Sequence, residues 1–173
     1  MLSVSPETMN QHTFNTAIGP CRVEWQGDQL AGFRLPGDDV VLNPLQNAES
    51  VPEWVASLIA RVQRHLAGEL QDFALAPFAF EALTNFQREV YRAAVEVKPG
   101  QVETYGGLAR RMGYPVSASR AVGTALGQNP WPLLVPCHRF VGADGKMTGF
   151  SAPGGIQTKL RLLAIEGAEM FGI

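Results

Sequence analysis

The stretch that decides the fold is NPWPLLVPCHR, residues 129–139. Its prolines lack a backbone N–H and fix their own φ, which excludes a helix or a central strand here. The apolar strip Leu133–Val135 between them must nevertheless be buried. We therefore expect a rigid, buried approach that ends at Cys137, with the imidazole of His138 beside it.

A cysteine reacts as its thiolate, and a neighbouring histidine lowers the thiol pKa or takes its proton. A stiff segment also holds a nucleophile in place at little cost in entropy. The alternative for an isolated Cys-His pair is a core cysteine followed by a histidine, because buried free cysteine is common. The dipeptide alone does not decide between these interpretations.

Length and composition indicate an ordinary globular protein. The 173 residues suit one or two small domains. No apolar run reaches membrane-spanning length and no signal sequence is present, so we expect a cytoplasmic protein without a membrane partner. Cys21 and Cys137 cannot form a disulfide framework, and they show no metal-ligand spacing with the three histidines, His12, His65 and His138.

The net charge of −2 conceals an asymmetry. Residues 1–83 carry four basic and ten acidic side chains, a net charge of −6, which leaves ten basic and six acidic side chains, net +4, in residues 84–173. Contacts with DNA phosphates need local positive charge rather than a positive total. The second half is therefore the candidate for nucleic-acid binding, although small domains also differ in charge by chance.

Three short alternating runs between turn residues predict an antiparallel meander: His12–Ala17, Cys21–Gln26 and Gln29–Leu35. Cys21 has strand spacing with its apolar neighbours, so we interpret it as a packing residue. A helix is expected to follow, with Ser50 as its cap and an apolar stripe from Trp54 to Leu66. We expect His65 on the rim of that helix, and residues 69–83 as an extended connector.

The second half reads as helices. Thr84 and Gln87 form a capping box that opens one helix, and Thr104 caps a second that runs through Met112. A third begins at Ser117 or Ala118 and ends near Gly127, which gives the outline of a helix-turn-helix. Gly123 inside this third helix costs about 1 kcal/mol relative to alanine, so it needs a reason: close approach to DNA or close helix packing.

After Cys137, residues 143–146 indicate a hairpin turn between short strands, and residues 156–166 a last helix with Leu160, Leu163 and Ala164 inward. The expected fold class is α+β. A small N-terminal domain with an antiparallel sheet and a helix, residues 1–83, precedes a mostly helical domain, residues 84–173, that carries the helix-turn-helix and the cysteine.

The run Pro136–Arg139 after an Asn-Pro turn, with Tyr105, Arg120 and Glu166 at suitable distances, resembles the O6-alkylguanine-DNA alkyltransferases, also called methylated-DNA–protein-cysteine methyltransferases. The resemblance is dense from about Leu83 to the end and weaker in the N-terminal half. It implies that Cys137 accepts the alkyl group, that His138 deprotonates it through a bound water, that Glu166 orients His138, and that Asn129 braces the turn.

The resemblance also implies a DNA-contacting set. Tyr105 would contact a flipped guanine and a phosphate, and Arg120 would fill the gap in the duplex while its helix enters the minor groove. The full set is Tyr105, Arg120, Ala121, Gly123, Arg139 and Ser151. Phe140, Phe150 and the Ala152-Pro153 insertion depart from the family pattern and leave the size of the accepted alkyl group open.

The implied function is direct-reversal DNA repair. A monomer would bind double-stranded DNA containing O6-alkylguanine, flip the base and transfer the alkyl group irreversibly to Cys137, without a cofactor or a metal. Activity on O4 of thymine is left open. Two alternatives also remain: an alkyltransferase-like protein that binds the lesion without transfer, and a cysteine hydrolase.

Overall fold

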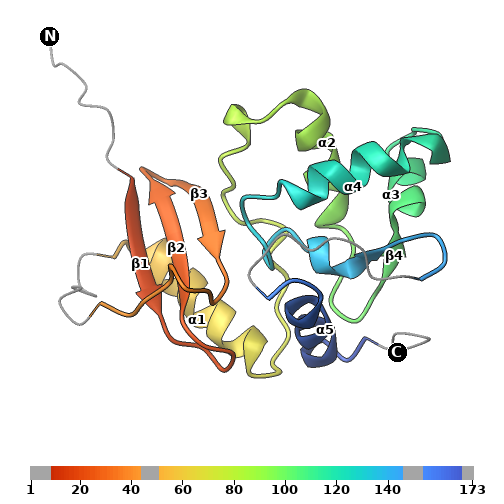
Figure 1. The fold of residues 1–173 in the computed structure, drawn as a ribbon. Coiled ribbons are helices and arrows are strands. Elements are labelled where there is room, and N and C mark those ends of the chain that lie inside the picture. Colours follow the sequence, from red (N-terminus) through yellow and green to blue (C-terminus); the bar gives the residue numbers. More distant parts are fainter. Residues whose placement is uncertain (1–8, 44–50, 146–153, 169–173) are drawn as a thin grey trace, which may run out of the picture.

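The computed structural model describes residues 9–43, 51–145 and 154–168. The N-terminal half contains the strands β1 (Asn10–Phe14), β2 (Cys21–Gln26) and β3 (Gln29–Arg34) in an antiparallel sheet of that order (Figure 1). The predicted meander is confirmed. Its first strand ends earlier than expected, because Thr16 and Gly19 exchange two backbone hydrogen bonds of 3.1 Å that turn the chain.

Helix α1 (Glu53–Leu66) covers one face of this sheet with its apolar stripe. The prediction of Ser50 as the cap is wrong, since Pro52 occupies the N-cap position without a side-chain hydrogen bond, and Ser50 itself lies outside the described residues. A proline there requires no N–H of its own, which makes it compatible with a helix start.

The connector predicted for residues 69–83 also hydrogen bonds to the N-terminal sheet. Leu30 in β3 donates to the carbonyl of Pro77 at 2.7 Å and accepts from the amide of Ala79 at 2.9 Å, so the connector pairs with the edge of the sheet. Phe73 and Phe78 are buried. A 3₁₀ turn, η2 (Phe80–Ala82), leads into the second half.

The second half contains α2 (Asn85–Ala94), α3 (Tyr105–Arg111), the 3₁₀ turn η3 (Val116–Ala118) and α4 (Ser119–Gly127). The capping box of Thr84 and Gln87 is confirmed, and the hydroxyl of Thr104 accepts from the amide of Gly107 at 2.9 Å. Helix α3 packs against α4 across a turn, as the helix-turn-helix prediction requires.

A two-stranded parallel sheet joins the helix-turn-helix to the cysteine segment. Strand β4 (Glu103–Thr104) pairs with β5 (Phe140–Val141), which directly follows the 3₁₀ turn η4 (Cys137–Arg139). The expected hairpin partner of β5 lies outside the described residues, and within them β5 pairs with β4 instead. The start of α3 is therefore fixed beside the reactive segment.

Helix α5 (Ile156–Ile165) presents an inward face that differs from the predicted one. Leu163 is buried as expected, but Ala164 is exposed and Leu160 only partly buried. The buried positions follow the spacing i, i+3, i+4, i+7: Lys159, Leu162, Leu163 and Glu166. A reading based on hydrophobicity alone misses this face, because its two ends are charged.

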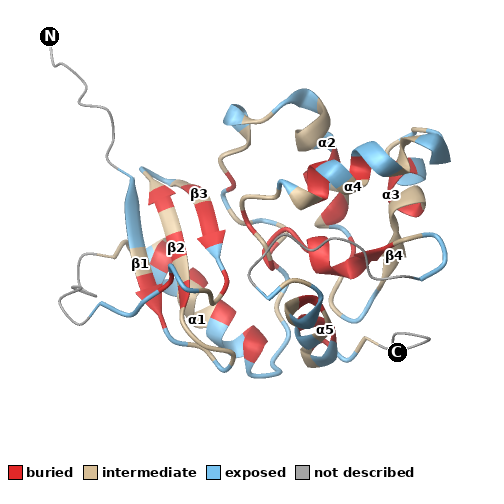
Figure 2. Ribbon diagram, viewed as in Figure 1, coloured by how far each residue is buried: buried red, intermediate tan, exposed pale blue. Residues whose placement is uncertain are grey.

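One hydrophobic cluster runs through both halves of the chain. Figure 2 shows buried residues in the strands and α1 of the N-terminal half and in the helices of the second half. The indole of Trp131 donates to the carbonyl of Leu30 at 3.0 Å, and the amide of Phe33 donates to Pro130 at 3.0 Å. The α+β fold class is confirmed. Among the described residues, no helix is long and apolar enough to cross a membrane.

Candidate active site and helix-turn-helix pocket

The segment before Cys137 is locked by its own backbone. The Asn129 side chain donates to the carbonyl of Val135 at 2.8 Å and accepts from the amide of Trp131 at 2.9 Å. Leu133 has φ of 81°, a left-handed conformation that costs a non-glycine residue about 1 kcal/mol, and its complete burial holds it there. Asn129 therefore has the bracing geometry that was predicted for it.

Pro136 delivers the chain to the cysteine. Its φ of −81° and ψ of 63° are those of an inverse γ-turn, closed by the amide of Cys137 donating to Val135 at 2.8 Å. Because the proline ring fixes φ, this turn has little freedom to deviate. The thiol is thus placed at the first residue of η4, at the end of a rigid approach.

The Cys137 side chain is buried, with 8% of the residue exposed. Burial raises the pKa of the thiol, although the side chain of Asn129 and the positive charge of Lys159 oppose this rise. The resting thiol is therefore protonated at neutral pH and needs a base before it can react. Cys21 lies far along the chain in β2, where burial raises its pKa to about 12, in agreement with a packing role.

His138 is fully buried, and its Nε2 lies 2.9 Å from Oε2 of Glu166. Burial lowers the pKa of His138 below its ordinary value, although Glu166 opposes this. The ring is therefore neutral at pH 7, and because the carboxylate can only accept, the single proton lies on Nε2. Nδ1 is left as a base, and none of the described residues hydrogen bonds to it.

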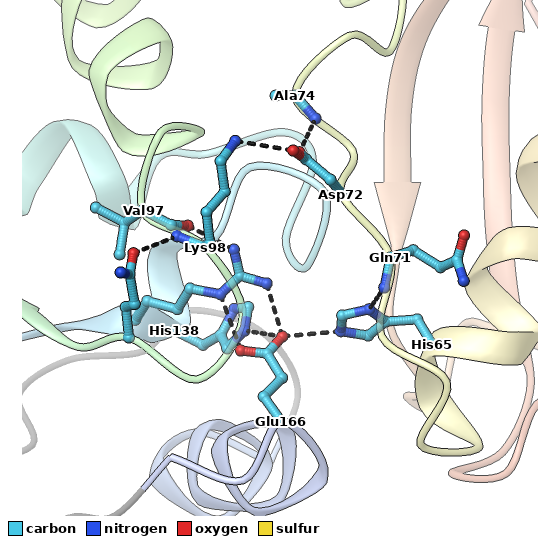
Figure 3. Close-up of polar contacts among 10 residues, drawn as sticks. His65, Gln71, Asp72, Ala74, Val97, Lys98, His138 and Glu166 are labelled. Carbon is cyan, nitrogen blue, oxygen red and sulfur yellow. Dashed lines mark hydrogen bonds and ion pairs between the residues drawn. The ribbon is translucent and has the colours of Figure 1, made fainter.

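Glu166 follows the last residue of α5 and is the centre of a buried charge cluster (Figure 3). Burial opposes its ionisation, but His138 and Arg139 outweigh that effect and hold the pKa of its carboxyl well below the ordinary range. Arg139 donates from Nε to Oε1 and from Nη2 to Oε2, both at 2.8 Å, and from Nη1 to the carbonyl of Val97 at 2.7 Å.

This geometry corrects the prediction that Arg139 contacts DNA. The residue is only 4% exposed, and its guanidinium is used in a bidentate pair with Glu166. A buried carboxylate needs a countercharge, which the adjacent arginine of the Pro-Cys-His-Arg run supplies. Arg139 therefore stabilises the buried charge cluster around Glu166 and is not exposed for contact with DNA.

The prediction that His65 lies on the rim of its helix is wrong. The His65 side chain is completely buried, and its Nε2 lies 2.8 Å from Oε2 of Glu166 (Figure 3). It also occupies the helical position three residues after Val62 and one before Leu66, both buried. That spacing was a signal in the sequence that His65 belongs to the inward face.

Lys159 is a further site residue that the sequence reasoning missed. It is 1% exposed, donates to the carbonyl of Phe140, and has its Nζ 5.9 Å from the centre of the Tyr105 ring. Burial lowers the pKa of Lys159 to about 8, although Cys137 opposes this change. The lysine therefore lies close to Tyr105, the first residue of α3, and its charge acts on the thiol of Cys137.

Beside Tyr105 the helix-turn-helix opens into a cavity of about 680 Å³. Tyr105, Arg120 and Gly123 line it as the predicted DNA-contacting set would require, and so does Arg110, which was not singled out. Among the described lining residues no carboxylate occurs, so the pocket is positively charged. A side-chain carbon on Gly123 would meet the Tyr105 ring at 3.9 Å, an ordinary contact, so close packing does not require glycine there.

The other members of the predicted DNA-contacting set are not gathered at this pocket. Ala121 is exposed on α4 but is not among the described lining residues. Ser151 lies outside the described residues, as does Phe150. Phe140 is fully buried in β5.

Replacing Glu166 by glutamine tests the charge cluster. Glu166→Gln leaves the buried Arg139 without a countercharge, so we expect the free energy of unfolding at pH 7 to fall by about 3 kcal/mol. The folded-state pKa of Glu166 is lowered, so its contribution is complete above the ordinary value of 4.5 and is lost as the pH falls below it. The wild-type and variant curves of stability against pH should therefore converge below pH 4.5, measured by urea denaturation.

Glu103→Gln is the matched control, because Glu103 forms a partly exposed pair with Arg111. It should cost less than about 1 kcal/mol. A Glu166→Gln variant as stable as the wild type at neutral pH would contradict the assignment of Glu166 as the countercharge.

Residues 85–168 match the family model described as the DNA binding domain of 6-O-methylguanine DNA methyltransferase. A methylated-DNA–protein-cysteine methyltransferase of Methanosarcina acetivorans is 43% identical over 159 residues, which cover 90% of this chain and 96% of that protein. A relative of the same name from Haemophilus influenzae is 41% identical over 88% of this chain and 83% of its own length.

Solved structures of proteins with related names are similar to this chain over most of its length. A Mycobacterium tuberculosis OGT in complex with DNA superposes with a TM-score of 0.69 at 33% identity, covering 91% of this chain and 92% of that one. An O6-methylguanine-DNA methyltransferase of Pyrococcus kodakaraensis gives 0.67 at 27% identity, covering 93% and 100%. With a buried Cys-His-Glu arrangement beside a helix-turn-helix pocket, and relatives matched over nearly their whole length, the chain belongs to the methylated-DNA–protein-cysteine methyltransferase family.

Proposed function

We propose that the protein repairs DNA by direct reversal, transferring the alkyl group from O6 of guanine to Cys137 in a single irreversible turnover. The observation that carries this proposal is the arrangement at η4. A protonated, nearly buried thiol lies next to a neutral histidine whose Nε2 is held by Glu166 and whose Nδ1 is unbonded among the described residues.

The protonation states support a relay that acts on demand. Burial raises the pKa of Cys137 and lowers that of His138, so a neutral pair is favoured over a thiolate and an imidazolium in the resting protein. A thiol that stays protonated is protected from chance electrophiles, because the thiolate is the reactive form. Lys159 and Asn129 both favour the thiolate once the proton leaves.

In the proposed reaction, His138 Nδ1 takes the thiol proton, through a water as the family resemblance implies. The sulfur of Cys137 attacks the alkyl carbon, the bond from that carbon to O6 breaks, and its electron pair returns to guanine. Guanine takes up a proton, so the net proton transfer is from the thiol of Cys137 to the released guanine. Glu166 stabilises the intermediate imidazolium, as the carboxylate does in hydrolase triads. The product thioether is not reversed by cellular thiols, so each molecule reacts once.

The pocket at the helix-turn-helix supports DNA as the partner. Guanine O6 cannot be reached by a nucleophile inside the base stack, so we propose that the nucleotide is flipped out. Arg110 and Arg120 supply positive charge for phosphates, and we assign Arg120 the role of filling the duplex gap. Entry of α4 into the minor groove is part of the same proposal.

Three further assignments stay predictions of our own: a division into domains at residues 83 and 84, a monomer in solution, and a cytoplasmic location. The two proposed domains share a hydrophobic core, because both halves bury side chains in one cluster.

The transfer itself is tested by mass spectrometry. The protein is incubated with an excess of duplex that carries one O6-methylguanine, and the intact mass and the modified peptide are determined. We expect one methyl group per protein, located on Cys137, and an equal amount of restored guanine. Cys137→Ser should show no gain while still binding the duplex, and Cys21→Ser should react like the wild type, because Cys21 is buried in the sheet.

Two results would contradict this proposal in different ways. Lesion binding without a change of mass would favour a binding module that flags damage. Removal of more than one methyl group per protein would favour hydrolytic turnover.

Arg120 is tested by comparing duplex with single-stranded substrate. Because an inserted side chain offsets the cost of unstacking only in a duplex, Arg120→Ala should slow transfer about tenfold in duplex and less than about threefold in a single strand. Arg64→Ala removes the same charge from the exposed face of α1 and serves as the control. Equal slowing on both substrates would contradict a gap-filling role.

A further inference from the structure

The reactive centre contains a side chain from the N-terminal half of the protein. His65 lies near the end of α1 and Glu166 at the end of α5, 101 positions apart in sequence, yet His65 Nε2 and Glu166 Oε2 are 2.8 Å apart. Figure 3 shows the carboxylate of Glu166 between the imidazoles of His65 and His138. Both rings are completely buried.

The proton of His65 can be located from its two partners. The backbone amide of Gln71 donates to Nδ1 at 2.9 Å, and an amide nitrogen cannot accept, so Nδ1 carries no proton. A neutral imidazole then has its proton on Nε2, the atom that faces Glu166. His65 is therefore a neutral donor to the carboxylate, in a tautomer fixed by the main chain of the connector.

The carboxylate oxygen that serves His138 also accepts from His65. Oε2 receives hydrogen bonds from His65 at 2.8 Å, from His138 at 2.9 Å and from Arg139 at 2.8 Å, while within the described part of the chain Oε1 receives only the second bond of Arg139. Arg139 is held in turn by the carbonyl of Val97. Removing His65 would leave the side of the carboxylate that faces α1 without a donor, and the carboxylate could then rotate away from His138.

We infer that His65 is a positioning residue for the alkyl transfer, which holds Oε2 of Glu166 in register with Nε2 of His138 and so makes the N-terminal half part of the reactive centre. This inference rests on the proposed function, in which His138 is the base. His65 does not touch the thiol or the substrate in this role. It acts through Glu166.

The same contact affects how strongly His138 holds a proton. The charged and titratable groups that act on His138 are Glu166 after the end of α5, Arg139 from η4 and His65 from α1. Glu166 is the group that favours the protonated form of His138, so a carboxylate held in register with Nε2 raises the pKa of His138. A carboxylate that rotates away after the loss of His65 should therefore lower the pKa of His138 further, in the same direction as its burial.

The test compares two amides of different length. In His65→Asn the side-chain oxygen can still accept from Gln71, but the side chain is too short to reach Glu166. In His65→Gln an acceptor and a donor are both available, and the donor reaches the carboxylate. Val62→Ala, which makes a cavity one turn earlier on the same face of α1, controls for a loosened helix.

The measured quantity is the second-order rate constant for methyl transfer from a duplex with one O6-methylguanine, as a function of pH. His65→Asn should react about tenfold more slowly at pH 7, as expected for a lost hydrogen bond to a charged group, and the acid limb of its profile should move to lower pH. His65→Gln should remain within about threefold of the wild type with an unmoved limb. Affinity for the lesion duplex, measured in a Cys137→Ser background, should be unchanged in both.

If His65→Asn does not fold, His65→Phe takes its place with the same expected result, because a phenyl ring keeps the contact with Phe73, whose ring centre lies 5.5 Å from that of His65. Wild-type rate and profile in the variant without a donor would overturn the inference. An equal loss in His65→Gln or in Val62→Ala would also overturn it, since packing would then explain the effect. These failures differ from failure of the proposed function, in which the wild-type protein itself gains no methyl group.

Discussion

The buried carboxylate of Glu166 is the interaction on which the reactive centre depends. From the residues that the structure describes, its two oxygens accept four hydrogen bonds, two from Arg139 and one each from His138 and His65. An isolated carboxylate in such a place would take up a proton, so its partners His138, Arg139 and His65 together keep it ionised. Because it is ionised, it fixes the proton of His138 on Nε2 and leaves Nδ1 without a proton and able to act as a base.

The fold brings these groups together from distant parts of the chain. The proline-rich segment fixes Cys137, α5 supplies Glu166 and Lys159, and α1 supplies His65. The pairing of β4 with β5 fixes the helix-turn-helix beside them, so the pocket at the helix-turn-helix and the thiol share one frame. A reaction that must read damage and act on it in one encounter benefits from such a frame, because little reorganisation is left for the moment of transfer.

Much of this could be predicted from the sequence, because the signals were local. Proline geometry predicted the approach to Cys137, capping residues such as Thr84 and Thr104 predicted helix starts, and alternation predicted the sheet. What failed were residues whose surroundings are set by distant segments. His65 and Lys159 lie on inward helical faces that polarity seemed to exclude, and Arg139 was assigned to DNA because its carboxylate partner, 27 residues away, was not visible in the local pattern.

The central claim is tested most directly by the protonation of His138 in the resting protein. Nitrogen-15 spectra of histidine-labelled protein, recorded as a function of pH, distinguish the two neutral tautomers and the charged ring. The account predicts that His138 is neutral at pH 7 with its proton on Nε2, and that Glu166→Gln removes this preference. A proton on Nδ1, or a charged His138 at pH 7, would contradict it.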